Sequence, residues 1–166
     1  DNDTLIGDIG NDTLDGGTGF NLVSYEYLET NTGISASLTD STDTIVTIAT
    51  GDVDTLRNIS GVVGSIGNDT LVGNSSDNRF SGGLGNDLIS GGVGADTLDG
   101  GAGINTLSYA SSGDGVTVSL LTSIVEGGDS SGDVISNFTH LIGSQSHDVL
   151  SGNSAANSIT GNAGND

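Results

Sequence analysis

Residues 82–108 read GGLGNDLIS GGVGADTLD GGAGINTLS, three successive frames of nine residues. Each frame has glycine at positions one, two and four, an Asp or Asn at position six and an apolar residue at position eight. Glycines allow the positive φ angles of tight turns. Carboxylate and carbonyl oxygens gathered on such turns are the ligands that Ca²⁺ prefers. The stretch therefore predicts a series of metal-binding turns at a fixed spacing.

The same frame recurs in three blocks, residues 1–24, 64–108 and 143–166. Every full frame begins with glycine, and the eighth position is apolar wherever the chain reaches it: Leu5, Leu14, Val23, Leu71, Phe80, Ile89, Leu98, Leu107, Leu150 and Ile159. One apolar side chain per frame favours a short strand after each turn, stacked around a thin core. We predict an all-β fold, a parallel β-roll or β-solenoid with calcium-binding nonapeptide turns, in which two frames make one rung of 18 residues.

Composition excludes other architectures. The chain has 29 Gly, no Pro, Cys, Met or Trp, and 4% aromatic residues, which argues against a large globular core. Helices are poorly supported because Gly, Ser, Thr, Asn and Asp dominate and no apolar face of helical period persists. Without cysteine there is no disulfide framework and no thiol chemistry.

Charge points to cations as partners. The formal net charge is −20, from 22 acidic and two basic residues, and a compact chain so charged repels itself unless cations neutralise it. Arg57 and Arg79 lie in no basic cluster, which disfavours nucleic acid and anionic membrane surfaces. No stretch approaches 18 consecutive apolar residues, so we expect no membrane insertion.

Two interposed segments, 25–63 and 109–142, separate the blocks and resemble each other. NLVSY at 21–25 matches NTLSY at 105–109, and ISASL at 34–38 matches VTVSL at 116–120. The chain is therefore expected to hold two tandem units of roughly 80 residues, with the interposed segments as wider rungs. TIVTIAT at 44–50 is a strand candidate of the first unit alone. Because Asp3 and Asp166 are sixth positions of incomplete frames, residues 1–166 are expected to be one continuous solenoid cut from a longer chain.

The 18-residue rung pairs the sixth positions. Asp69 is expected over Asp87, Asp87 over Asn105, Asn78 over Asp96, Asp148 over Asp166 and Asp3 over Asn21, and Asp69/Asp87 is the best predicted site. Asp87 alone among these Asp residues has partners on both sides, whereas Asp12 has Thr30 where its partner belongs. Ser76, Ser146 and Ala155 replace the glycine at position four, so their turns are expected to be strained or free of metal. Turn chemistry alone is the alternative reading, since Asp and Asn beside Gly favour turns without metal.

Catalytic groups are scarce. His140 and His147 have no counterparts in the first unit and are expected to be surface or turn residues. Ser108–Ser112 lacks a partnered base, so nucleophilic catalysis has no basis and we expect no enzyme activity. Tyr25, Tyr27 and Tyr109 suit strand or edge positions better than sugar stacking.

The nonapeptide G-G-x-G-x-D-x-U-x, with U apolar, resembles the calcium-binding repeat of RTX (repeats-in-toxin) proteins. The interposed pattern is similar to that of large bacterial adhesins, surface-layer proteins and alginate-epimerase modules. This resemblance implies type I secretion, disorder without calcium inside the cell and folding outside it. It also implies that carbonyls of positions one and three of one turn, and two and four of the next, join the sixth-position ligands. The implied ligands are Asp3, Asp12, Asn21, Gly64, Ile66, Asp69, Asn78, Gly83, Gly85, Asp87, Gly92, Gly94, Asp96, Gly101, Gly103, Asn105, Asp148, Gly164 and Asp166.

Two function classes follow. One is a calcium-stiffened structural segment of an extracellular bacterial adhesin, filament or surface layer, in contact with further copies of itself or with a surface or matrix polysaccharide. The other is an accessory module of a secreted polysaccharide-modifying enzyme. The net charge and the tandem units favour the first. Ice binding is disfavoured because the threonines at position seven are interrupted by Leu22, Arg79, Leu88 and Val149.

Overall fold

The computed structural model describes residues 1–166 except 8, 29–30, 41–42 and 50. The described residues form an all-β structure with one short 3₁₀-helix, Gly128–Ser130, and no α-helix, which confirms the predicted class. The strands are β1 Thr4–Ile6, β2 Thr13–Asp15, β3 Leu22–Ser24, β4 Ile34–Ser37, β5 Thr44–Ile48, β6 Val53–Arg57, β7 Gly61–Val63, β8 Thr70–Val72, β9 Arg79–Ser81, β10 Leu88–Ser90, β11 Thr97–Asp99, β12 Thr106–Ser108, β13 Thr117–Ser119, β14 Ile124–Glu126, β15 Val134–Ser136, β16 His140–Ile142, β17 Val149–Ser151 and β18 Ile159–Thr160.

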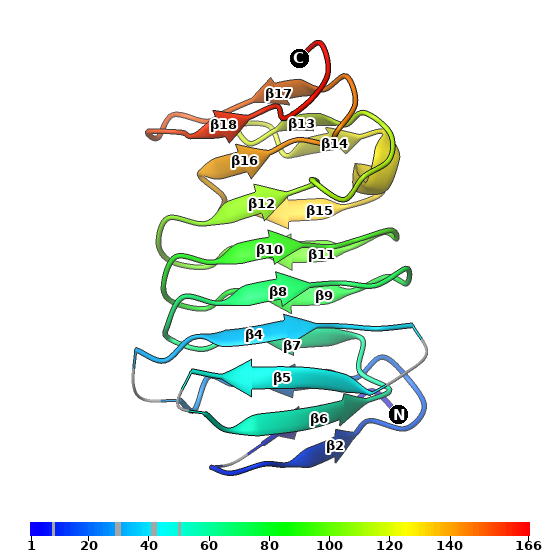
Figure 1. Ribbon diagram of the computed structural model, residues 1–166, viewed down its shortest axis with the longest axis vertical. Helices are drawn as coiled ribbons and strands as arrows, with labels where there is room; N and C mark the ends of the chain where they lie inside the picture. Colours follow the sequence, from blue (N-terminus) through cyan, green and yellow to red (C-terminus); the bar gives the residue numbers. More distant parts are fainter. Residues whose placement is uncertain (8, 29–30, 41–42, 50) are drawn as a thin grey trace.

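The strands lie across the longest axis of the molecule and stack along it in two layers (Figure 1). One layer is a six-stranded sheet in the order β1-β3-β7-β9-β11-β15, and the other is a nine-stranded sheet in the order β18-β16-β12-β10-β8-β4-β5-β6-β2. In residues 64–108 the chain alternates between these two sheets. Each strand therefore pairs in parallel with the second strand on, as Leu88 with Thr70 and Thr97 with Arg79. This is the 18-residue register that the frame predicts.

The eighth position supplies the core between the two sheets. Leu71, Ile89 and Leu107 of one sheet and Phe80 and Leu98 of the other are at most 1% exposed. Side chains alternate between the faces of a strand, so the seventh and ninth positions point away from this core. The result is a single apolar ladder, one side chain wide in each layer, which suits a sequence with few large apolar residues.

The interposed segments contain the strands that interrupt the regular alternation. In the first unit β4, β5 and β6 form an antiparallel run inserted between β8 and β2 of the nine-stranded sheet. In the second unit β13 and β14 form a three-stranded sheet with β17, and β15 lies beside β11 in the six-stranded sheet. The two insertions therefore differ: β4 to β6 extend the nine-stranded sheet, whereas β13 and β14 lie in a separate sheet with β17.

The correspondence of the two units extends to single hydrogen bonds. Asn58 and Asn137 both adopt positive φ, and their amides donate to Asp15 and Asp99 at the ends of β2 and β11. The expectation of a strand at 44–50 in the first unit only was wrong on one count, since β14 occupies the matching place in the second unit and pairs antiparallel with β13. Residue 50 of that prediction lies outside the described residues.

Candidate metal-binding turns

The sixth-position side chains form a hydrogen-bonded ladder along the edges of the sheets. The backbone N–H of Asp69 donates to Oδ1 of Asp87 at 2.9 Å, and that of Asp87 donates to Oδ1 of Asn105 at 2.9 Å. The pairs Asn78–Asp96, Asp3–Asn21 and Asp148–Asp166 are joined in the same way, each 18 residues apart. The backbone thus fixes one oxygen of each side chain, which leaves the second oxygen of an Asp or the Nδ2 of an Asn for other partners.

Two carboxylate oxygens in this ladder are buried without a partner. These are Oδ2 of Asp87 and Oδ2 of Asp96, whose residues are 2% and 1% exposed. A buried carboxylate oxygen without a donor is costly unless a cation meets it. At Gly82 a Cβ atom would touch Oδ2 of Asp87 and lie 2.6 Å from the carbonyl oxygen of Gly100. Carboxylate and carbonyl oxygens therefore converge on the space that a Cβ of residue 82 would fill. This donor set fits Ca²⁺.

Burial raises the pKa of both carboxyls. The pKa of Asp87 rises to about 6 and that of Asp96 to about 7, in each case mainly because the charged form is desolvated. The ladder hydrogen bond partly opposes this shift, and neighbouring acidic groups add to it. The described residues contain no group of three or more His, Cys, Asp or Glu side chains able to hold a metal. A cation here therefore needs backbone carbonyls as well as carboxylates.

The turns divide into two kinds. In the first, which we call glycine turns, positions two and four both have positive φ. Gly83 and Gly85 have φ of 91° and 111°, Gly92 and Gly94 have 92° and 136°, and the turns that begin at Gly16, Gly100 and Gly161 follow the same pattern. A side chain at Gly85 would also meet the carbonyl of Gly67 on the previous rung. Both unpartnered carboxylates belong to glycine turns.

In the second kind, which we call polar turns, position two is Ser65, Asn74, Ser144 or Asn153 and does not adopt positive φ, unlike Asn162 in the turn that begins at Gly161. The backbone N–H of this residue donates to the sixth-position side chain, as from Ser65 to Oδ2 of Asp69 at 2.6 Å. Its side-chain oxygen accepts the N–H of position four. The turns that contain Ser76, Ser146 and Ala155 are therefore stabilised by their own hydrogen bonds, and the expected strain is absent because position four does not adopt positive φ.

In polar turns, hydrogen bonds from within the protein occupy both oxygens of the sixth-position carboxylate. Asp69 accepts hydrogen bonds from Ile34 N–H, Ser65 N–H and Ser65 Oγ, and Asp148 accepts the equivalent three. In the predicted pair Asp69/Asp87, only Asp87 keeps a buried, unpartnered oxygen. The second expected double-carboxylate pair, Asp148/Asp166, likewise contains one saturated carboxylate.

The sixth-position Asn residues supply their own donors. The Nδ2 of Asn21 donates to the carbonyl of Asn58, that of Asn78 to Ser60, and those of Asn105 and Asn157 to Asn137 and Thr139. An amide N–H thus occupies a backbone carbonyl of a neighbouring rung. The Asn positions are satisfied within the protein, whereas Asp87 and Asp96 are not.

Sequence reasoning missed two aspartates of this ladder, Asp54 and Asp133. Oδ1 of Asp54 accepts the N–H of Asp12, and Oδ1 of Asp133 accepts the N–H of Asp96, both at 2.9 Å. Asp12 therefore has a ladder partner, and Asp96, with Asn78 and Asp133, has partners on both sides just as Asp87 has. Residue 30, the expected neighbour of Asp12, lies outside the described residues. The signal was present: Asp54-Thr55-Leu56 and Asp133-Val134-Ile135 repeat the order acid, variable, apolar of positions six to eight.

The remaining predicted ligands lie in the turns or at the ends of the stack. Asp3 and Asp166 are exposed, and Asp12 is half-buried. Among the predicted carbonyl donors, Gly83 already accepts the N–H of Ala102 and Gly101 accepts the amide of Asn105. The other predicted carbonyl donors also lie in the turns between strands: Gly64, Ile66, Gly85, Gly92, Gly94, Gly103 and Gly164.

Histidine and tyrosine have structural partners. Nδ1 of His140 accepts the N–H of Ser158, and Nδ1 of His147 accepts that of Asn165, each 18 residues on. Tyr25 and Tyr109 are at most 1% exposed, so their rings are not available for stacking on a sugar. Their hydroxyls donate to Oδ2 of Asp54 at 3.0 Å and of Asp133 at 2.8 Å.

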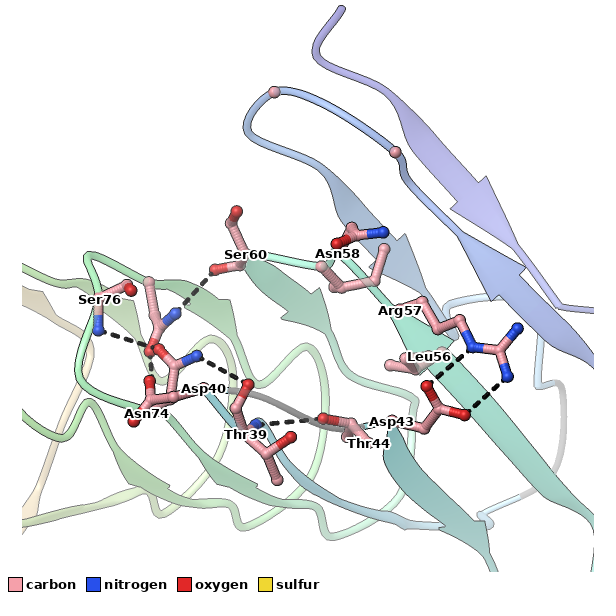
Figure 2. A pocket seen from close by; sticks show the side chains of 14 residues that line it. Thr39, Asp40, Asp43, Thr44, Leu56, Arg57, Asn58, Ser60, Asn74 and Ser76 are labelled. Carbon is pink, nitrogen blue, oxygen red and sulfur yellow. Dashed lines mark hydrogen bonds and ion pairs between the residues drawn. The ribbon is translucent and has the colours of Figure 1, made fainter.

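A cavity of about 500 Å³ lies beside the first interposed segment (Figure 2). Its wall includes Arg57, which forms a two-pronged ion pair with Asp43 at 2.7 and 2.8 Å. Asn74 bridges the carbonyl of Thr39 and the N–H of Ser76 in the same wall. Several of the drawn polar groups thus bind one another, and the unpartnered carboxylates of Asp87 and Asp96 do not line this cavity.

Comparison with known families agrees with this geometry. The model of the RTX calcium-binding nonapeptide repeat matches the chain in four copies, at residues 1–23, 62–89, 72–107 and 140–166. These matches span more than half of the chain, which therefore belongs to the family of RTX calcium-binding nonapeptide repeats, and Ca²⁺ is its ligand. No curated protein matches the chain as a relative. None of the helices in the described residues is long and apolar enough to span a membrane.

Proposed function

We propose that this chain is a β-roll that folds and stiffens on extracellular calcium and serves as a structural segment of a secreted bacterial surface protein. The observation that carries the proposal is the pair of buried, unpartnered oxygens of Asp87 and Asp96 beside glycine turns. Each lies in a ladder that repeats every 18 residues. A stack of repeating rungs suits an elongated part of a surface adhesin, filament or surface layer.

The residues proposed to hold calcium are those of the glycine turns. Asp87 and Asp96 supply carboxylates, and the turns that begin at Gly82, Gly91 and Gly100 supply carbonyls. The bound ion supplies the positive charge that these buried carboxylates lack. The chain's own part is to hold one oxygen of each carboxylate by a backbone N–H, to exclude water by burial, and to keep the glycines at positive φ. Polar turns and Asn amides stabilise the remaining rungs without metal.

The mechanical role follows from the stacking. Each rung contacts only its neighbours, so the stack grows along one axis and its stiffness depends on every turn. Strands β1, β2 and β18 are at the ends of their sheets and expose unpaired backbone edges. We infer that these edges contact further repeats or another copy of the chain. We propose that the segment carries no catalysis of its own.

The alternative is an accessory module of a secreted polysaccharide-modifying enzyme. Its support is the cavity of Figure 2, which is lined by polar side chains such as Asp40, Asn74 and Asn78. An anionic polymer would meet a chain with a formal charge of −20, so calcium would have to bridge the two. Because the enzyme module requires this additional bridging calcium, the structural role is favoured over it.

Small-angle scattering tests the proposal. In calcium the isolated segment is expected to scatter as an elongated particle and to lack hydrolase or epimerase activity on polysaccharides. A near-spherical particle in saturating calcium would contradict the rod. Turnover of a polysaccharide by the segment alone would replace the structural role with the enzymatic one.

A further inference from the structure

The second interposed segment re-enters the ladder at Asp133. In β15 Val134 pairs with Thr97 of β11, so Asp133 lies opposite Asp96 as a sixth-position residue would. The N–H of Asp96 donates to Oδ1 of Asp133 at 2.9 Å, the same bond that joins Asp69 to Asp87. A residue outside every nonapeptide therefore occupies a ligand position of the repeat. The spacing is 37 residues instead of 18, which hides it from any search by frame.

Asp96, one rung from Asp133, has an unsatisfied carboxylate oxygen beside Gly91 of its own turn. Asp96 is 1% exposed, and its Oδ2 has no hydrogen-bond partner. It belongs to a glycine turn, with Gly92 and Gly94 at positive φ. The next rung brings no nonapeptide turn but the stretch before β15, in which Gly132 also has positive φ and lies against Ala95. The junction is thus half glycine turn and half interposed segment.

Acidic side chains act on the carboxylate of Asp96. Asp133 is 6% exposed, and its Oδ2 accepts the hydroxyl of Tyr109 at 2.8 Å. The charges that act on Asp96 come from Asp133, Asp77 and Asp129, and all of them are acidic. The donor of their hydrogen bond is the backbone N–H of Asp96, so the bond neutralises neither side chain. Two buried carboxylates on adjacent rungs repel each other unless a cation offsets their charge. The junction therefore needs a neutralising cation, as the glycine turns do.

The first unit repeats the arrangement. The N–H of Asp12 donates to Oδ1 of Asp54, and Tyr25 donates to its Oδ2. A Cβ at Gly7 would lie 2.8 Å from Oδ2 of Asp54 and 3.6 Å from Oδ2 of Asp12. Both carboxylates therefore face the first glycine of the turn, as Asp87 faces Gly82. The recurrence of Tyr, Asp and ladder bond in both units indicates a shared role for the junction.

We propose that Asp133 completes a calcium site with Asp96, and Asp54 one with Asp12, so that each interposed segment supplies half of a metal site at the end of a repeat block. The inference rests on the proposed calcium-dependent fold and extends it to residues outside the repeats. Calcium then clamps the interposed segments to the blocks, and the buried tyrosine holds the non-repeat carboxylate in place.

Counting bound calcium by native mass spectrometry and calorimetry tests the inference. Asp133→Asn keeps an oxygen for the N–H of Asp96 but removes the charge, so it is expected to bind one ion fewer. Asp96→Asn is expected to lose the same ion, and the double variant no more than either single one. Tyr109→Phe, which leaves both carboxylates, is expected to keep the full count. An unchanged count in Asp133→Asn would overturn the inference.

The two levels of the account fail separately. If the natural chain binds no calcium, the proposed function fails. If it binds calcium and Asp87→Asn loses an ion while Asp133→Asn does not, only the junction site fails.

A second readout leaves both proposed carboxylate ligands unchanged. The chain has no Trp and three Tyr, and Tyr109 contacts the proposed ligand Asp133. Terbium ions, which replace calcium in oxygen sites, emit when a tyrosine at short range is excited. Tyrosine-excited emission is expected to fall in Tyr109→Phe while the number of bound terbium ions stays constant. Emission that does not change would contradict a site at this junction.

Discussion

Asp87 and Asp69 share the same position in the repeat but differ in what surrounds them. The residue two places into the turn decides the difference: Gly83 takes positive φ and leaves Oδ2 of Asp87 open, whereas Ser65 donates twice to Asp69. A carboxylate that is already saturated gains little from a cation, and one that is buried and open gains much. Metal dependence is thus a property of the turn and not of the aspartate alone.

Asp87→Asn is predicted to have opposite effects with and without calcium. In chelator the variant should keep at least as much strand signal as the natural chain, because a buried, unpartnered charge is gone. In saturating calcium it should lose about 1–3 kcal/mol of stability, the usual cost of an unmet buried polar group. Thermal unfolding followed by circular dichroism in both buffers measures this.

Asp114→Asn is the matched control, since Asp114 is exposed and the charge change is identical. Asp12→Ala does not serve as a control, because Asp12 has Asp54 as its ladder partner. Equal effects of Asp87→Asn and Asp114→Asn on the calcium-loaded protein would argue against a ligand role for Asp87.

At the scale of the turns, the polar kind is predicted to be stable without metal. Ser144→Ala removes the hydroxyl that donates to Asp148 and accepts the N–H of Ser146. The expected loss is about 1–2 kcal/mol, since each hydrogen bond contributes about 1 kcal/mol net. Because the bonds do not involve calcium, the loss should not change with calcium concentration in the range where the chain is folded. A loss that grows with calcium would assign Asp148 to a metal site.

Glycine turns respond to a different substitution. Gly85 has φ of 111°, and a side chain there would meet the carbonyl of Gly67. Gly85→Ala is expected to destabilise the calcium-loaded protein by roughly 1–3 kcal/mol through backbone strain. Gly113→Ala is the control, because nothing lies within 4 Å of its Cβ position and its φ is not positive. Chemical unfolding at fixed calcium compares the two, and an equal loss in both would contradict a strained turn.

The repeat blocks could be read from the sequence because their interactions recur every 18 residues. Leu71, Ile89 and Leu107 follow from the eighth position alone. Asp54 and Asp133 could not be reached in this way, since their partners are 42 and 37 residues away and the length between them is set by the interposed strands. The saturation of Asp69 was equally hidden, because it depends on where the Ser65 hydroxyl points. Periodic contacts are visible in a sequence, and the closure of an insertion onto a repeat is not.

For the whole molecule, the raised carboxyl pKa values predict a dependence on pH that calcium reverses. In the folded, metal-free chain burial raises the pKa of Asp87 to about 6 and of Asp96 to about 7, above the ordinary value of 3.8. A raised folded pKa contributes stability that is fully present below pH 3.8 and is lost as pH rises through 6 to 7. The chelated chain should therefore be more folded at pH 5 than at pH 8.

With calcium the trend should run the other way, because protons compete for the same carboxylates. The calcium concentration at half-folding should rise as pH falls from 8 to 5. Strand content measured over a grid of pH and calcium tests both signs. A chelated chain that gains structure between pH 5 and pH 8 would show that these carboxylates are not desolvated.

The central claim is that calcium completes this fold, because above their pKa the buried carboxylates on glycine turns are charged and the chain has a formal charge of −20. Its most direct test is a calcium titration of the isolated segment at pH 7.5, followed by far-ultraviolet circular dichroism. The account predicts coil in excess chelator, a cooperative change to strand as calcium is added, and a higher midpoint in Asp87→Asn. A full strand signal in excess chelator, unchanged by calcium, would contradict it.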